Sequence, residues 1–191
     1  MTDARRRRLG RRELVVLLDE SGRPVGTAPK ATVHTASTPL HRAFSCYLFS
    51  PTGQLLLTRR AETKPTFPGV WTNSVCGHPA PGESDIAAIR RRARHELQLT
   101  VTALTCVLPD FRYRASSGGI VENEICPVYL GRTSGQPTPA PGEVGDHQWV
   151  DWPQFLRHLQ DQADAFSPWS VLQAQQLQHT KAVERYLTGQ F

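Results

Sequence analysis

The chain has 191 residues, of which 39% are hydrophobic and 20% are charged. This length suits one domain with a substantial core, and the composition is that of a soluble globular protein rather than a disordered tail. The formal net charge of +5 comes entirely from residues 1–12, where six arginines outweigh Asp3. The remaining chain is neutral, which excludes a general electrostatic attraction to nucleic acid.

The arginine-rich start predicts a disordered basic tail over residues 1–12, followed by a single domain over residues 13–191. Such a tail either contacts nucleic acid or anionic lipid, or is a solvated terminus, and we favour the solvated terminus. No apolar run approaches the roughly 20 residues that cross a bilayer. We therefore expect a cytoplasmic protein without a membrane or nucleic-acid partner, and the oligomeric state stays open.

Short apolar runs separated by Gly, Pro, Asp and Ser predict a series of strands. In chain order, strands are expected over residues 13–19, 44–49, 54–58, 70–75, 101–107, 120–130 and 148–150. The second and third strands form a hairpin, and residues 111–119 join the sixth strand to the one before it. Three prolines and two glycines in residues 133–142 predict a surface loop.

Helices are predicted in the middle and at the end of the chain. Ser84 is a suitable N-cap for a helix that runs to about Leu97, with apolar residues at helical spacing and arginines on the opposite face. Pro153 and Pro168 are each expected at the first position of a C-terminal helix, with Ser167 as the cap of the last one. The predicted fold class is α+β, with a mixed β-sheet between helices.

Four cysteines occur in the chain, and none forms a Cys-x-x-Cys pair. A disulfide framework or a zinc knuckle is therefore not expected. Cys46, Cys106 and Cys126 lie in apolar, strand-like runs, where small buried hydrophobic residues are the usual interpretation. Cys76 differs because Gly77 and His78 follow it.

Two short motifs carry groups that bind metals or move protons. Cys76 and His78 are two positions apart, and so are Glu122 and Glu124. In an extended strand, residues i and i+2 point to the same face. A thiol, an imidazole and two carboxylates in a common cleft are costly to bury unless they bind a cation or act as acids and bases.

Two further histidines extend this set. His34 and His41 lie seven residues apart in a loop-like segment. The candidate metal ligands are then His34, His41, His78, Glu122 and Glu124. Mixed nitrogen and oxygen donors suit Zn²⁺ or Mn²⁺ better than Mg²⁺. The alternative is that these are unrelated surface residues.

Several basic residues could hold a phosphate group. Lys30, Arg60, Lys64 and Arg92 lie near strand ends or on the central helix. Such side chains can clamp a diphosphate through charge-assisted hydrogen bonds. A solvated charged surface is the alternative for each of them.

The segment Gly77-x5-Glu83-x7-Arg91 resembles the first half of a Nudix box, which places glutamates on a helix to bind Mg²⁺ against a diphosphate. The second half departs from the pattern. Arg92 and His95 stand where the box has glutamates, Gln98 replaces its glycine, and only Glu96 remains of the catalytic pair. Hydrolysis is therefore not expected.

Longer strings resemble the type I isopentenyl-diphosphate delta-isomerases, and they occur in that family's order over roughly residues 14–175. The strings are Pro68–Pro79 (PGVWTNSVCGHP), Asp110–Ala115 (DFRYRA), Gly119–Glu124 (GIVENE) and Ala165–Trp169 (AFSPW). The resemblance implies a Nudix-like fold and the interconversion of isopentenyl and dimethylallyl diphosphate through a tertiary carbocation, with proton addition and removal on opposite faces of the substrate.

The resemblance also implies roles for individual residues. Glu124, assisted by Tyr113, protonates the alkene, Cys76 removes the second proton as a thiolate, and the Trp169 ring faces the cation. His34, His41, His78, Glu122 and Glu124 match a divalent metal site for Mn²⁺, Zn²⁺ or Mg²⁺. Glu96 matches a ligand of the Mg²⁺ that accompanies the substrate, and Lys30, Arg60, Lys64 and Arg92 match diphosphate contacts.

Two alternative functions and one alternative role for a single residue remain at this point. A diphosphate hydrolase is disfavoured by the altered Nudix box, and a non-catalytic metal-binding module is disfavoured by the presence of Cys76, Tyr113, Glu124 and Trp169. From its position alone, Trp169 also suits a core residue at the start of a helix.

Overall fold

The structure is a computed structural model that describes residues 13–191, so the expected tail lies outside the described residues. The strands are β1 (Leu14–Leu18), β2 (Pro24–Pro29), β3 (His41–Arg42), β4 (Phe44–Phe49), β5 (Leu55–Arg60), β6 (Trp71–Thr72), β7 (Val75–Gly77), β8 (Thr102–Leu108), β9 (Arg112–Ser117), β10 (Ile120–Ile125), β11 (Val128–Arg132) and β12 (Val144–Val150). The α-helices are α1 (Lys30–Val33), α2 (Asp85–Leu97), α3 (Trp152–Asp161), α4 (Pro168–His179) and α5 (Ala182–Leu187).

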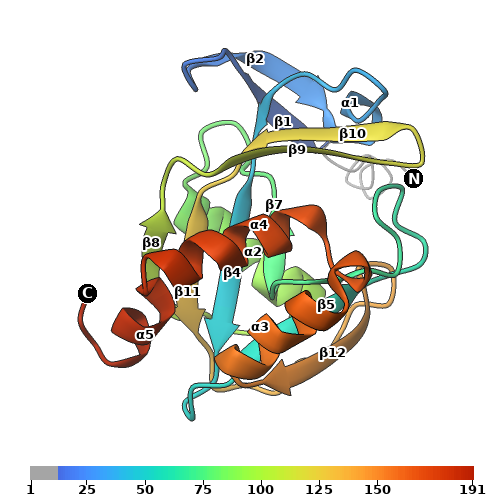
Figure 1. The fold of residues 1–191 in the computed structure, drawn as a ribbon. Coiled ribbons are helices and arrows are strands. Elements are labelled where there is room, and N and C mark those ends of the chain that lie inside the picture. Colours follow the sequence, from blue (N-terminus) through green and yellow to red (C-terminus); the bar gives the residue numbers. More distant parts are fainter. Residues whose placement is uncertain (1–12) are drawn as a thin grey trace, which may run out of the picture.

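The strands form two mixed sheets (Figure 1). The first has the order β2-β1-β3-β10-β9, and the second has the order β12-β5-β4-β11-β8, with β6 paired to β5 and β7 paired to β4. In each sheet one parallel pair lies beside antiparallel ones, namely β10 with β3 and β11 with β4. The α+β class with mixed sheets and flanking helices is thus confirmed.

The second sheet is covered by helices on both faces. In strand β4, Phe44, Cys46 and Leu48 pack in the cluster that contains the buried face of α2. Tyr47 and Phe49 pack in the other cluster, which contains apolar side chains of α3, α4 and α5. Because side chains alternate along a strand, β4 is apolar on both faces and fully buried. Figure 1 shows α3 and α4 on one side of β4 and α2 on the other.

Several predicted boundaries differ from the structure. The expected strand over residues 120–130 divides into β10 and β11, because the chain passes from one sheet to the other at Cys126 and Pro127. Proline lacks the N–H needed to continue a ladder. The expected strand at residues 70–75 likewise divides into β6 and β7, and β12 begins at Val144 rather than at residue 148.

The caps and turns were mostly predicted. Ser84 accepts a hydrogen bond from the Ala87 N–H, and Ser167 accepts one from the Ser170 N–H. Pro168 is the first residue of α4, whereas α3 begins one residue before Pro153.

None of the helices in residues 13–191 is long and apolar enough to cross a bilayer. The assignment of residues 13–191 to a single domain stays a prediction.

The cysteines follow the sequence prediction in part. Cys46 and Cys126 are buried, as expected. Cys106 is exposed, so its predicted burial is wrong. It lies on β8, which is an edge strand of the second sheet.

Candidate active site

A cavity of about 890 Å³ is lined by residues of both sheets. The candidate site residues that line it are Lys30, His34, Arg60, Lys64, Cys76, His78, Arg92, Glu96, Tyr113, Glu122, Glu124 and Trp169. His41 is fully buried and lies directly beside Glu124. The structure therefore brings together side chains that the sequence spreads over 140 residues, from Lys30 to Trp169.

Strand register places three of these residues side by side. On strand β10, Glu124 pairs with His41 of β3 on one side and with Tyr113 of β9 on the other. The Tyr113 hydroxyl donates a hydrogen bond of 2.9 Å to Glu124 Oε2. The opposite carboxylate oxygen, Oε1, lies 2.9 Å from His78 Nε2 and 3.4 Å from His41 Nε2. One carboxylate thus joins a phenol to two imidazoles.

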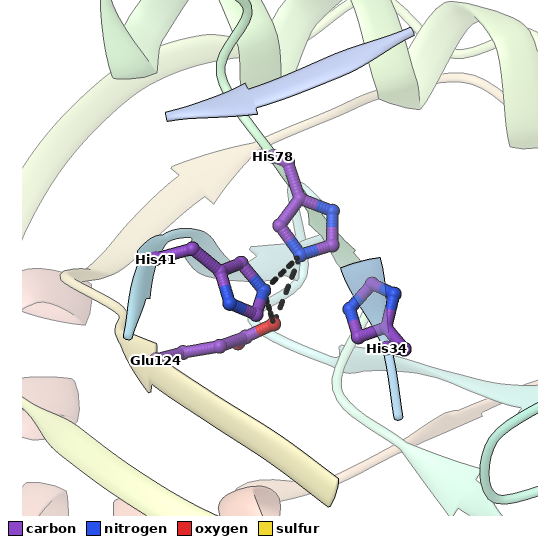
Figure 2. Close-up of side chains that lie close together, drawn as sticks. All are labelled: His34, His41, His78 and Glu124. Carbon is purple, nitrogen blue, oxygen red and sulfur yellow. Dashed lines mark hydrogen bonds and ion pairs between the residues drawn. The ribbon is translucent and has the colours of Figure 1, made fainter. Parts of the chain in front are cut away.

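Three imidazoles and this carboxylate form a candidate metal centre (Figure 2). One ligand atom from each of His34, His41, His78 and Glu124 lies within 4.8 Å of all the others. The Nε2 atoms of His41 and His78 are 3.2 Å apart. Glu122 stands next to this group, with its Oε2 atom 3.9 Å from His34 Nε2. Glu96 lies elsewhere, beside Arg92.

The donor set fits a divalent ion. His34 Nε2 is buried, and no hydrogen-bond partner for it occurs within residues 13–191. Buried polar atoms are rarely left unpaired, so a ligand is the simplest partner for it. His41 Nδ1 bonds to the Pro39 carbonyl at 2.9 Å, the outer contact that typically orients a metal-binding histidine. Four nitrogen and oxygen donors of this kind suit Zn²⁺ or Mn²⁺.

Without an ion, the protons in this cluster are unevenly shared. Burial, with help from His78 and His41, lowers the pKa of His34 to about 4. Burial opposes ionisation of Glu124, but hydrogen bonds with His41 and His78 outweigh it and hold the pKa of Glu124 well below its usual range. Burial and the neighbouring Glu124 raise the pKa of Glu122 to about 7. Near neutral pH, His34 is neutral and Glu124 is ionised, as metal ligands need to be.

Cys76 has different hydrogen-bond partners from His78, which lies two positions further along the chain. Its strand β7 pairs with β4, opposite Ser45. The thiol is 3.5 Å from Ser45 Oγ and donates to Asn73 Oδ1 at 2.9 Å. Burial raises the pKa of the Cys76 thiol to about 11, so it is protonated at neutral pH in this state. Cys76 is also outside the group of candidate metal ligands.

Asn73 is a site residue to which the sequence analysis gave no role. Its Oδ1 atom accepts from the Cys76 thiol and also from the Trp169 indole N–H, at 3.2 Å. Its Nδ2 group donates to the carbonyls of Cys46 and Val75 at 3.0 and 3.1 Å. The side chain is fully buried. Asn73 therefore fixes Cys76 and Trp169 relative to each other. The sequence feature that could have identified Asn73 as a site residue is its position within the string PGVWTNSVCGHP.

Trp169 is packed against other aromatic rings at the cavity wall. The ring centroids of Phe67 and Tyr113 lie 5.3 and 5.6 Å from it. The Arg60 guanidinium carbon lies 5.5 Å from the ring centroid. Phe67 has a φ of 48°, an uncommon value for a bulky residue. Trp169 is thus both a core residue at the start of α4 and part of the cavity surface.

The four candidate phosphate-binding residues are paired in different ways. Lys30 contacts Glu13 at 2.6 Å. Arg92 Nε donates to Glu96 at 2.7 Å. Arg60 donates to the carbonyls of Thr66 and Phe67, at 2.7 and 3.0 Å. Lys64 pairs with Glu143, a residue that the sequence analysis missed because nothing in its local pattern distinguished it.

The Nudix-like segment begins at β7 and continues along α2. Arg91 forms two hydrogen bonds with Glu83, at 2.7 and 2.8 Å. A Cβ atom on Gly77 would come within 3.1 Å of the Arg92 side chain, so only glycine fits easily there. Gln98, at the position where the box has glycine, adopts the left-handed conformation with φ of 56°. The backbone has kept the turn although the glycine is absent.

Comparison with known proteins places the chain in a family. A NUDIX domain model matches residues 39–170. An isopentenyl-diphosphate Delta-isomerase of Mycolicibacterium vanbaalenii is 60% identical over 162 residues, which cover 84% of this chain and 89% of that protein. The isopentenyl-diphosphate Delta-isomerase of Citrobacter koseri is 52% identical over 178 residues, covering 93% and 98% of the two chains.

Solved structures agree on the fold. The protein DR0079 from Deinococcus radiodurans superposes with a TM-score of 0.61 at 22% identity, over 78% of this chain and 90% of that one. At this identity the likeness concerns the fold alone. With the high identity over nearly the full length of the named relatives, the chain belongs to the isopentenyl-diphosphate Delta-isomerase family, within the Nudix fold.

Proposed function

We propose that this protein interconverts isopentenyl diphosphate and dimethylallyl diphosphate. The observation that carries the proposal is that Cys76 and the Tyr113–Glu124 pair line one cavity with Trp169 and a cluster of basic side chains. This arrangement offers two proton-transfer groups, an aromatic face and an anion-binding end. Family membership supports the choice of substrate.

The reaction adds a proton at C4 of an unactivated alkene and removes one from C2. An alkene is a weak base, so the protein must supply a well-placed acid and keep water away from the tertiary cation that forms. We propose Glu124 as the group that protonates C4, with Tyr113 as its hydrogen-bond partner. Because Glu124 is ionised near neutral pH in this state, it must take up a proton before it can act as the acid. Cys76 would accept the C2 proton on the opposite face of the substrate.

The charge state of Cys76 constrains this assignment. A base must be deprotonated before it acts, whereas burial raises the pKa of the Cys76 thiol to about 11 without metal or substrate. Cationic neighbours lower a thiol pKa. The assignment therefore requires the bound metal and the Mg²⁺-diphosphate to stabilise the thiolate. If they do not, the thiol is the donor and Glu124 the acceptor.

A tertiary cation needs stabilisation without a nucleophile. We propose that the face of Trp169 provides it by a cation–π interaction, on the order of 1–2 kcal/mol in a dry site. The indole N–H is held by Asn73 at 3.2 Å, so the ring cannot turn freely. Phe67 and Tyr113 pack against it.

We propose that His34, His41, His78, Glu122 and Glu124 hold one divalent ion, with Mn²⁺, Zn²⁺ and Mg²⁺ as candidates. An ion there would supply positive charge that makes the protonated Glu124 a stronger acid. Glu96 is proposed to hold the Mg²⁺ that accompanies the diphosphate. Lys30, Arg60, Lys64 and Arg92 are proposed to contact the diphosphate oxygens.

The decisive experiment is incubation with isopentenyl diphosphate and Mg²⁺ in D₂O. Deuterium in the dimethylallyl product is expected, and an allylic product pool without deuterium would refute the proposal. Release of phosphate without an allylic product would instead indicate a hydrolase. The Cys76→Ala variant is expected to lose turnover but keep its metal, whereas His78→Ala is expected to lose the metal. Near-full activity of Cys76→Ala would show that the thiol does not transfer the proton.

A further inference from the structure

Glu143 extends into the cavity from a loop that is held at both ends. The residue directly precedes β12, and its backbone N–H donates to the Ala140 carbonyl at 2.8 Å. Its carbonyl accepts from the Ala61 N–H at 3.1 Å, and the Ala140 N–H donates to the Glu96 carbonyl at 2.8 Å. These bonds tie the loop to α2 and to the end of β5. The position of the Glu143 backbone is therefore fixed, while its carboxylate is held by its side-chain partners.

The Glu143 carboxylate joins two of the basic residues. Its Oε2 atom pairs with Lys64 Nζ and lies 3.0 Å from the Arg92 guanidinium. Burial opposes its ionisation, but Lys64 and Arg92 outweigh this and hold the pKa of Glu143 below its usual value. Arg92 is 5% exposed and also pairs with Glu96, so Glu143 is the second of its two carboxylate partners. Glu143 thus stabilises Lys64, and together with Glu96 it stabilises Arg92, when no substrate anion is bound.

The charges at this end of the cavity nearly cancel. Four basic side chains line the cavity together with three carboxylates that pair with them, Glu13, Glu96 and Glu143. Their net charge is therefore about one positive unit. A fully ionised diphosphate ester carries about three negative charges, and binding of one divalent cation leaves about one. The site is matched in charge to the complex with the cation rather than to the free diphosphate.

We propose that Glu143 is the displaceable counter-ion of Lys64 and Arg92, and that it makes the site select a diphosphate complexed with a divalent cation over the free diphosphate. The diphosphate as ligand class rests on the proposed function above. Carboxylate and phosphate oxygens use the same N–H donors, so an incoming diphosphate competes with Glu143 for them. A free diphosphate also meets the repulsion of this carboxylate, which an accompanying cation relieves.

The test uses inorganic pyrophosphate as the probe, titrated calorimetrically into the full-length chain with excess Mg²⁺ and in metal-free buffer. The measured quantity is the affinity for pyrophosphate with Mg²⁺ divided by the affinity without Mg²⁺. In Glu143→Gln, the affinity for pyrophosphate without Mg²⁺ is expected to rise about tenfold, equivalent to ~1.4 kcal/mol, and the ratio to fall accordingly. Glu143→Asp keeps the charge and is expected to keep a ratio close to that of the wild type.

Glu20→Gln is the matched control. It removes the same charge and an ion pair with Arg112 at 2.7 Å, but Glu20 does not line the cavity. Its ratio is expected to equal that of the wild type. Equal weakening of Glu143→Gln with and without Mg²⁺ would show that Glu143 is merely structural and would overturn the inference. So would an unchanged ratio, or a ratio in Glu143→Asp as low as in Glu143→Gln.

Pyrophosphate binding does not require turnover, so this test is separate from that of the proposed function. A chain that shows the expected ratios but forms no dimethylallyl diphosphate would refute the proposed function and leave the role of Glu143 intact. If the wild type isomerises its substrate while Glu143→Gln keeps the wild-type affinity ratio, the proposed function stands and the role of Glu143 is refuted.

Discussion

Replacement of Asn73 by alanine tests how Cys76 and Trp169 are held relative to each other. The substitution removes the acceptor of the Trp169 N–H, of the Cys76 thiol and of the Thr72 hydroxyl, together with both donors of the amide. For the Trp169 N–H, no other partner occurs within residues 13–191. A buried donor left unpaired costs about 1–3 kcal/mol, and the thiol adds a smaller amount. We expect a total loss of about 3 kcal/mol in the free energy of unfolding.

Thermal unfolding followed by circular dichroism measures this loss. For a chain of this size, about 3 kcal/mol corresponds to a decrease in Tm of about 6–12 °C. The chain's other asparagine, Asn123, is the control, because its amide makes a single hydrogen bond of 3.3 Å to the Thr38 carbonyl. Asn123→Ala is expected to lower the free energy of unfolding by less than about 1 kcal/mol.

A double-mutant cycle separates the contact with Trp169 from general damage. Trp169→Phe removes the indole N–H but keeps an aromatic ring, so its effect should overlap with that of Asn73→Ala. We expect a coupling of about 1 kcal/mol or more between the two substitutions. Effects that add within about 0.3 kcal/mol would mean that Asn73 does not hold the indole, and the reasoning would be wrong.

Three further outcomes are expected. In metal-free protein, the Cys76 thiolate should form only near pH 11, because burial favours the neutral thiol and raises its pKa to about 11. The measurement is the difference in thiolate absorbance between the wild type and Cys76→Ala as a function of pH, and such a difference at pH 7 would contradict the prediction. Gln98→Gly should raise the free energy of unfolding by about 0.5–1 kcal/mol, because Gln98 has a φ of 56°, a left-handed conformation that glycine adopts without strain. Urea unfolding measures this change, and a decrease in stability would show that the Gln98 backbone is not strained. Chelator treatment should lower the Tm of the wild type by several degrees, because an ion that binds only the folded state stabilises it by about 2.7 kcal/mol at 100 times its Kd. Zn²⁺ or Mn²⁺ should restore the Tm of the wild type but not that of His78→Ala. A Tm that does not depend on metal would argue against the metal centre.

The local elements were largely predictable because they depend on neighbouring residues. The α2 helix follows from its cap at Ser84 and its apolar spacing, and its observed bounds, Asp85–Leu97, agree with the prediction. The hairpin of β4 and β5 likewise follows from its turn residues. The long run over residues 120–130 was misjudged, because an apolar pattern does not reveal at which residue a chain leaves one sheet for another.

The kinds of site residue were also predictable, because particular chemistries require particular side chains. The motifs around Cys76, Glu122 and Glu124 identified a thiol and two carboxylates, and family membership has since been shown by close relatives. The proton-transfer and metal-binding roles themselves stay predictions. Spacing alone predicted that Cys76 and His78 would share one face, but β7 ends at Gly77, and the two side chains have different partners.

Only the tertiary structure decided which side chains meet. The sequence determined an α+β chain that carries three candidate histidine ligands, two glutamates and a distinctive thiol. It could not show that Asn73 joins Cys76 to Trp169, 93 positions away in the chain, or that Glu143 neutralises Lys64 and Arg92. The physical reason is that hydrogen bonds and ion pairs between distant segments depend on strand register and loop path, which no local pattern of residues encodes.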